Sequence, residues 1–156
     1  MFVMTTRVNK KKIFGLLAAV AGLILLLVLL LGGGEATSTA APSMATNDGR
    51  VQFLKDFGWD VAASPVESGQ VRIPETASEI FDRYNTLQKS QGYDLNKYAG
   101  KTVMRYVYKI GNYPGATDPV YATLLVYKDQ VIGGDITDTS AKGVVRGFKM
   151  PDTAQS

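Results

Sequence analysis

One long apolar run stands near the start of the chain. From Ile13 to Leu31 the sequence reads IFGLLAAVAGLILLLVLLL, without a charged side chain. As a helix this run would extend about 28 Å, close to the thickness of the hydrocarbon core of a bilayer. We therefore predict a transmembrane helix over 13–31.

Small and polar residues follow this run. Residues 32–46, GGGEATSTAAPSMAT, show no apolar periodicity, which is typical of a flexible linker. The remaining chain has the length of one ordinary domain. We predict a folded domain over 47–151 and a short tail over 152–156.

Two stretches of the domain repeat apolar residues at helical spacing. The first follows Asn47 and Asp48, which can cap a helix, and stops at Gly58. The second begins at Pro74 and stops at Gly92. The apolar positions are Val51, Leu54 and Phe57 in the first helix, and Ala77, Ile80, Phe81, Tyr84 and Leu87 in the second.

The second half of the domain changes to runs rich in Val, Ile, Thr and Tyr, separated by turn residues, which predicts an antiparallel meander of four strands. Before the second helix, 60–63 and 70–73 predict a short N-terminal hairpin. The fold class is therefore α+β, with both helices against one face of the sheet. The four runs are Val103–Ile110, Val120–Tyr127, Val131–Thr137 and Val144–Phe148.

Charge is divided sharply along the chain. Residues 1–12 contain four basic residues and no acidic one, which leaves 13 basic against 14 acidic residues in the rest. By the positive-inside rule, residues 1–12 form a cytoplasmic stub and the domain is extracytoplasmic. The alternative is a cleaved signal peptide and a secreted domain. With no basic excess on the domain, we expect no nucleic-acid binding.

The sequence contains no cysteine and no histidine. This excludes disulfides, thiolate nucleophiles, Ser-His-Asp triads and His or Cys metal sites. No residue pattern indicates a cofactor. An exported domain without cysteine also suits a bacterium.

Tyrosines on the predicted sheet form the candidate binding surface. In the run 120–127, Val120 and every second residue after it suit the core, so Tyr121 and Tyr127 should lie on the other face. Exposed aromatic faces often mark interfaces. The alternative is ordinary packing, with the loop 111–119 serving only to reverse the chain. The proposed surface comprises Tyr106, Tyr108, Asn112, Tyr113, Tyr121 and Tyr127.

Other patterns carry weaker signals. Gly133 and Gly134 within a strand indicate a bulge or a close backbone approach rather than a phosphate loop. Asp135 and Asp138 could offer oxygens to calcium, but they lack the spacing of an EF-hand loop, so we predict no metal site. A hydrolase that uses two carboxylates stays open as an alternative, because that chemistry needs no histidine.

Five short runs of the domain can be compared with known families: FLKDFGW from Phe53, YNTLQKSQGYDL from Tyr84, YAGK from Tyr98, LLVY from Leu124 and VIGGD from Val131. With these runs the chain resembles a bacterial family known only as domain of unknown function 4830, over about residues 50–151. The resemblance implies an extracytoplasmic, membrane-anchored protein of anaerobic Gram-positive bacteria, and it implies no activity. We expect a non-enzymatic module of the cell envelope that binds an envelope or membrane protein. The alternative is an accessory subunit of a membrane complex.

Overall fold

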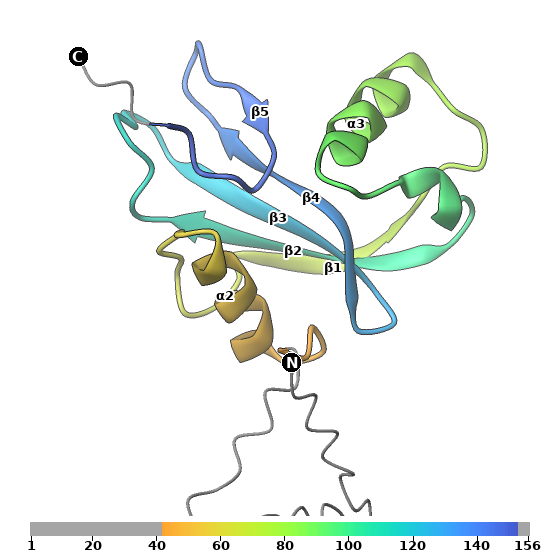
Figure 1. Ribbon diagram of the computed structural model, residues 1–156, viewed down its shortest axis with the longest axis horizontal. Coiled ribbons are helices and arrows are strands. Elements are labelled where there is room, and N and C mark those ends of the chain that lie inside the picture. The colour runs from red at the N-terminus through yellow and green to blue at the C-terminus, as the bar shows by residue number, and fades with distance from the viewer. Residues whose placement is uncertain (1–41, 153–156) are drawn as a thin grey trace, which may run out of the picture. The chain divides into compact units, whose positions relative to one another are not determined.

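The computed structural model describes residues 42–152, which form an α+β unit of two helices, one short 3-10 helix and a five-stranded antiparallel sheet (Figure 1). The predicted fold class is confirmed, with one more strand in the sheet than expected. The elements are α2 (Asn47–Asp56), β1 (Glu67–Arg72), α3 (Glu79–Ser90), η1 (Leu95–Tyr98), β2 (Thr102–Ile110), β3 (Val120–Tyr127), β4 (Gln130–Asp138) and β5 (Val145–Arg146).

The sheet has the order β1-β2-β3-β4-β5, and all neighbouring strands are antiparallel. The predicted meander is confirmed, although β5 is only two residues long. The predicted N-terminal hairpin is wrong. β1 pairs with β2 over six residues, whereas Val61 makes one isolated bridge to Ile110. Pairing with the long strand β2 gives all six residues of β1 a partner, whereas the predicted hairpin would pair only four residues.

Each helix begins where a side chain caps it. Thr46 accepts a hydrogen bond from the amide of Gly49 and caps α2, and Ser78 accepts one from the amide of Phe81 and caps α3. The prediction that α3 begins at Pro74 is therefore wrong, because the cap lies at Ser78. The end at Gly92 is confirmed by its φ of 88°, a left-handed conformation that favours glycine.

The two helices lie on opposite faces of the sheet, not on one face as predicted (Figure 1). Leu54 of α2 belongs to a large apolar cluster with Trp59 and Leu124. Phe81 and Tyr84 of α3 pack against a smaller cluster on the other face. We call these the α2 face and the α3 face. Successive side chains of β3 alternate between the two faces, so each amphipathic helix packs on an apolar surface.

The chain enters the domain against the hairpin turn between β3 and β4. Lys128 and Asp129 form this two-residue turn with φ of 45° and 64°, as primed hairpin turns require. Asp129 Oδ1 accepts hydrogen bonds from the Ser43 hydroxyl, at 2.9 Å, and from the Ala45 amide, at 2.6 Å. Met44 between them is buried in the core. The last residues of the predicted linker 32–46 therefore pack on the domain.

No helix within residues 42–152 is long and apolar enough to cross a membrane. The predicted transmembrane helix 13–31 and stub 1–12 lie outside the described residues, as do most of the linker and residues 153–156. Their prediction rests on the sequence alone.

Candidate functional site

The predicted tyrosine surface is divided by the sheet register. Tyr106 lies opposite Leu124 and Tyr108 opposite Ala122, so both tyrosines belong to the α2 face. Tyr121 lies opposite Lys109, on the α3 face. The prediction that Tyr106 and Tyr108 extend the patch of Tyr121 is wrong, because directly paired residues share a face.

Tyr108 and Tyr106 hold α2 against the sheet. The Tyr108 side chain is fully buried, and its hydroxyl donates to Asn47 Oδ1 at 2.9 Å and accepts from Arg50 Nε at 3.0 Å. The Arg50 guanidinium lies 3.7 Å from the centre of the Tyr106 ring. These contacts satisfy a buried arginine and a buried hydroxyl, so the two tyrosines are part of the packing.

Asn112 and Tyr113 brace the loop between β2 and β3. The Asn112 side chain accepts from the Asp60 amide and donates to the Gly58 carbonyl, both at 2.8 Å. The Tyr113 ring stacks on Trp59, with ring centres 5.8 Å apart and 6° between the planes. These contacts fold the chain back on itself, which was the alternative to a ligand-binding loop.

Tyr121 and Tyr127 lie on the face opposite Val120, as predicted, but α3 packs on that same face and the two tyrosines do not form one patch. Six residues separate them along β3, about 20 Å at strand spacing. Tyr127 packs edge-on against Tyr98, with ring centres 5.6 Å apart. Tyr121 borders a hollow of about 320 Å³ that α3 leaves open, together with Val66, Glu67, Arg105, Val107, Thr123 and Thr137. We call this the sheet-face hollow.

A buried carboxylate joins α3 to β4. Asp135 Oδ1 accepts from the Tyr84 hydroxyl at 2.8 Å, and Oδ2 accepts from the Thr137 hydroxyl at 2.6 Å. Burial raises the pKa of Asp135 above its ordinary value, against the lowering effect of both hydrogen bonds and of Arg105. Burial and the neighbouring Asp135 also raise the pKa of Tyr84. Both side chains are thus committed to each other.

The calcium alternative finds no support in these positions. Asp135 and Asp138 are three residues apart in β4, so their side chains point to opposite faces. Asp138 Oδ1 instead accepts from the Ser140 amide at 2.9 Å. Within residues 42–152, no group of three or more acidic side chains could hold a metal ion.

The two glycines of β4 let α3 approach the strand backbone. The Gly134 amide donates to Gln88 Oε1 at 2.8 Å, and the Gly134 carbonyl accepts from Gln91 Nε2 at 3.0 Å. A Cβ on Gly133 would lie 2.9 Å from Gln88 Oε1 of α3. The register against β3 shifts beside Gly133. The predicted close approach and bulge are both confirmed.

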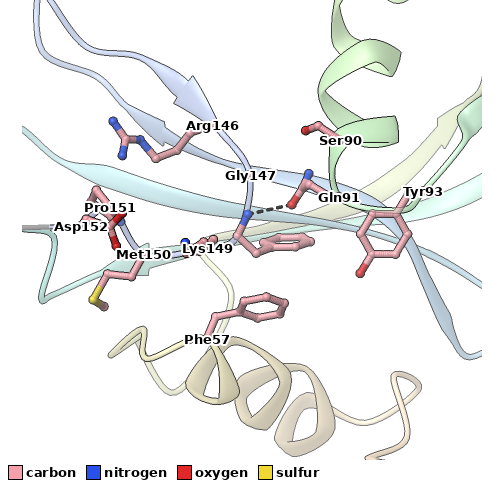
Figure 2. Close-up of a pocket in the computed structure, with 11 residues that line it drawn as sticks. Phe57, Ser90, Gln91, Tyr93, Arg146, Gly147, Lys149, Met150, Pro151 and Asp152 are labelled. Atoms are coloured by element: carbon pink, nitrogen blue, oxygen red, sulfur yellow. Dashed lines mark hydrogen bonds between the residues drawn. The ribbon is translucent and has the colours of Figure 1, made fainter.

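A groove of about 710 Å³ lies at the C-terminal ends of both helices (Figure 2). Phe57 contributes from the end of α2, and Ser90, Gln91 and Tyr93 from the end of α3. Residues 146–152, which include and follow β5, line the remainder. Figure 2 shows Phe57, Gln91 and Tyr93 reaching toward this C-terminal segment. We call this the C-terminal groove.

Phe148 fixes the floor of the C-terminal groove. Its carbonyl accepts from the Trp59 indole nitrogen at 2.6 Å, and its amide donates to Gln91 Oε1 at 2.7 Å. The buried Phe148 ring packs edge-on against Phe53 and Tyr93 and lies 5.5 Å from Phe57. Both backbone groups of Phe148 are therefore held by side chains from elements far apart in sequence.

The rim of the C-terminal groove carries cations. Arg146 and Lys149 line it, and neither takes part in an ion pair with a described residue. The Arg146 guanidinium lies 5.7 Å from the centre of the Tyr113 ring. Asp152 contributes one acidic side chain, so the lining residues carry a net positive charge. The groove thus combines aromatic surface with unpaired positive charge.

Sequence reasoning did not find the C-terminal groove. Phe57 was assigned to the buried stripe of α2, but its side chain is 38% exposed. The predicted strand 144–148 would place Phe148 in the sheet, whereas β5 ends at Arg146 and residues 147–152 lie outside it. The one available signal was the pair of cations flanking Phe148, and only the tertiary structure brings that segment to the ends of α2 and α3.

A comparison with protein families agrees with the family resemblance described above. No curated protein and no solved structure matches the chain. One family model matches residues 53–136, which include the end of α2, all of α3 and the central strands. The chain therefore belongs to the family described as Domain of unknown function (DUF4830).

Proposed function

We propose that this protein is a membrane-anchored, extracytoplasmic binding module without enzymatic activity. Its partner would be an envelope or membrane protein, bound in the C-terminal groove through an acidic residue next to an apolar side chain. The observation that carries the proposal is an aromatic floor, partly exposed at Phe57, beside two cations that have no described ionic partner.

The chemistry of the groove fits recognition. Its volume of about 710 Å³ is within the range of ligand sites. Aromatic side chains, methionine and arginine are enriched in interface cores. Phe57, Met150 and Arg146 supply one of each. The hydrogen bonds from Trp59 and Gln91 to the backbone of Phe148 support the same conclusion, because a rigid floor lowers the entropy cost of binding.

The anchored arrangement rests on the sequence. The uncharged run 13–31 has the length of a spanning helix. Four basic residues precede it, and the next basic residue after it is Arg50. A reporter enzyme fused after Ser156 should be active only outside the cytoplasm. Activity only inside the cytoplasm would remove the envelope from the proposal.

The carboxylate hydrolase is less well supported. Asp135 and Glu67 lie in one row across the α3 face, through Thr123 and Val107. Three strand spacings separate them, about 14 Å. Glycoside hydrolysis needs two carboxyl groups about 5 to 10 Å apart. Each acid is also engaged, Asp135 with Tyr84 and Glu67 with Arg105.

The proposal is tested by photo-crosslinking in the native membrane. The photoreactive residue p-benzoylphenylalanine is incorporated at Phe57 in the full-length protein, and at Ile80 in a matched control. Ile80 is also a large apolar residue, but it is 82% exposed on the outer side of α3, away from the groove. We expect one discrete crosslinked protein from position 57 and none from position 80.

Charge reversal sharpens this test. Arg146→Glu in the Phe57 crosslinking protein should abolish the crosslinked product, whereas Arg83→Glu on the exposed side of α3 should not. Equal crosslinking from positions 57 and 80, or a product that Arg146→Glu leaves unchanged, would contradict binding in the groove.

A further inference from the structure

The outer edge of β1 lies open along a full strand. β1 is one end of the sheet, and five of its six residues are exposed. The α3 face is also open beside this strand, because a Cβ added at Gly69 would meet nothing within 4 Å. The opposite edge is different, because β5 is only two residues long. Beyond β5, the side chains of Gln88 and Gln91 already bond to both backbone groups of Gly134 in β4. No such contact is made to the outer edge of β1 by a described residue, so β1 is the more open edge strand.

The backbone of β1 points half of its polar groups away from the sheet. The Ile73 amide donates to the Lys101 carbonyl, and the Ile73 carbonyl accepts from the Gly100 amide, so Ile73 faces β2. Antiparallel ladders alternate, so Arg72, Gln70 and Ser68 direct their N–H and C=O groups outward. None of these backbone groups has a hydrogen bond to another described element. The edge is a template for one more strand.

The charges at this edge are already neutralised. Arg72 pairs with Glu75, and Glu67 pairs with Arg105. Between them stand Ser68, Gly69, Gln70 and Val71, with neither lysine nor proline. Proteins commonly protect edge strands with lysine, proline or bulges. β1 has none of these devices, and its neutral centre suits an uncharged partner strand.

The sheet-face hollow begins beside the same edge. Val66 and Glu67 line it, and the Val66 side chain is 58% exposed. Alternate side chains of a strand added to β1 would stand on the α3 face, next to the mouth of this hollow. Strand addition combined with a pocket for alternate side chains is a general mode of peptide recognition.

We infer that β1 binds an extended, uncharged segment of a partner protein by strand addition, with one apolar side chain of that segment seated at the sheet-face hollow. This surface is separate from the C-terminal groove, and the inference does not depend on the proposed function. Backbone hydrogen bonds to Ser68, Gln70 and Arg72 supply the binding, and the hollow selects the side chain.

The test uses the isotope-labelled full-length chain in detergent micelles and a synthetic probe peptide, KTVTLTVTK. Its alternating β-forming residues match the neutral edge, and its terminal lysines keep it soluble. The control peptide, KTVPLPVTK, cannot pair as a strand. The KTVTLTVTK peptide should shift the amide signals of Ser68, Gln70 and Arg72 and slow their exchange with solvent, and the control should not.

A proline variant tests the backbone itself. Gln70→Pro removes an outward N–H that the ladder to β2 does not use, so the fold should persist. Binding should weaken by roughly tenfold, the factor expected when one or two hydrogen bonds are lost. Gln70→Thr keeps the N–H and should bind like the original. Ser68→Pro provides a second variant should Gln70→Pro fail to fold.

Three results would overturn the inference. One is equal binding of KTVTLTVTK by Gln70→Pro and Gln70→Thr. Another is a set of shifted amides that lies elsewhere, for example at the C-terminal groove. The third is slowed exchange at Ser68, Gln70 and Arg72 without peptide, together with dimers by light scattering, because a second copy of the chain would then occupy the edge. The groove test at Phe57 is unaffected by any of these results.

Discussion

The two faces of the sheet are covered by different chemistry. On the α2 face, a large cluster centred on Leu54, Trp59 and Leu124 excludes water by apolar contact. On the α3 face, the apolar cluster is smaller, and Tyr84, Gln88 and Gln91 fix the helix by hydrogen bonds to β4 and the segment after it. Apolar burial tolerates small shifts, whereas hydrogen bonds fix one register. Asn47 and Arg50 of α2 also bond to Tyr108, but the larger apolar cluster places more of the stability on the α2 face. The contacts of α3 with β4 depend more on hydrogen bonds.

The largest expected effect is on the α2 face. Trp59→Ala removes a side chain that is 1% exposed and frees the carbonyl of Phe148. The free energy of unfolding should fall by about 3–5 kcal/mol. Urea denaturation followed by circular dichroism measures this change. Ile80→Ala is the control, and it should change stability by less than about 0.5 kcal/mol.

A smaller loss is expected from the α3 face. Gln88→Leu keeps a side chain of similar size but removes the acceptor of the Gly134 amide. A buried donor without a partner should cost about 1–3 kcal/mol in the same measurement. Lys89→Leu, at an exposed neighbour in α3, is the control. A loss as large as that of Trp59→Ala would contradict the division of roles between the faces.

The pH dependence of stability separates the faces further. Burial raises the pKa of Asp135 above its ordinary value of 3.8, so the folded protein binds this proton more tightly than the unfolded chain. The contribution of Asp135 to stability is then fully present below pH 3.8 and is lost as pH rises through the raised pKa.

Asp135→Asn removes this titration. Urea denaturation between about pH 4 and pH 7 should show that the variant gains stability over the original protein as pH rises. Trp59→Leu, on the α2 face, should leave the pH slope unchanged. Identical slopes for Asp135→Asn and the original protein would show that the pKa of Asp135 is the same in the folded and the unfolded chain.

The smallest effect is expected at Tyr121. Its side chain is partly exposed beside the sheet-face hollow and makes no side-chain hydrogen bond with a described residue. Tyr121→Ser should change the free energy of unfolding by less than about 0.5 kcal/mol. Tyr108→Phe is the matched contrast, because it removes a buried hydroxyl that bonds to Asn47 and Arg50. Equal effects would show that burial does not distinguish the two tyrosines.

The strands were predictable because their signal is local. Alternation along 120–127 gave the bounds of β3 and the face of each of its residues, since the period of two is set by the backbone. The start of α3 was misplaced because both Pro74 and Ser78 are acceptable helix beginnings. The choice between them is made by the hydrogen bond from the Phe81 amide to the Ser78 hydroxyl, a contact that the sequence alone does not show.

The placement of the helices and the candidate site could not be predicted. An amphipathic stripe shows that a helix covers a sheet, but both faces of this sheet are apolar, so the stripe does not show which one. The C-terminal groove is lined by three segments from distant parts of the sequence. Membership of one hollow is a property of the tertiary structure. The glycines of β4 did predict a close backbone contact, because two glycines within one strand are a local feature of the sequence.

The hydrogen bonds of Ser43 and Ala45 to Asp129 have a mechanical consequence. Tension applied along the chain from the N-terminal side reaches the domain first at this carboxylate, and so at the tip of the central hairpin. The pull would then act on β3 and β4 before it could peel α2 from its seat. None of the residues that line the C-terminal groove takes part in this contact, so such a pull would enter the domain away from the groove.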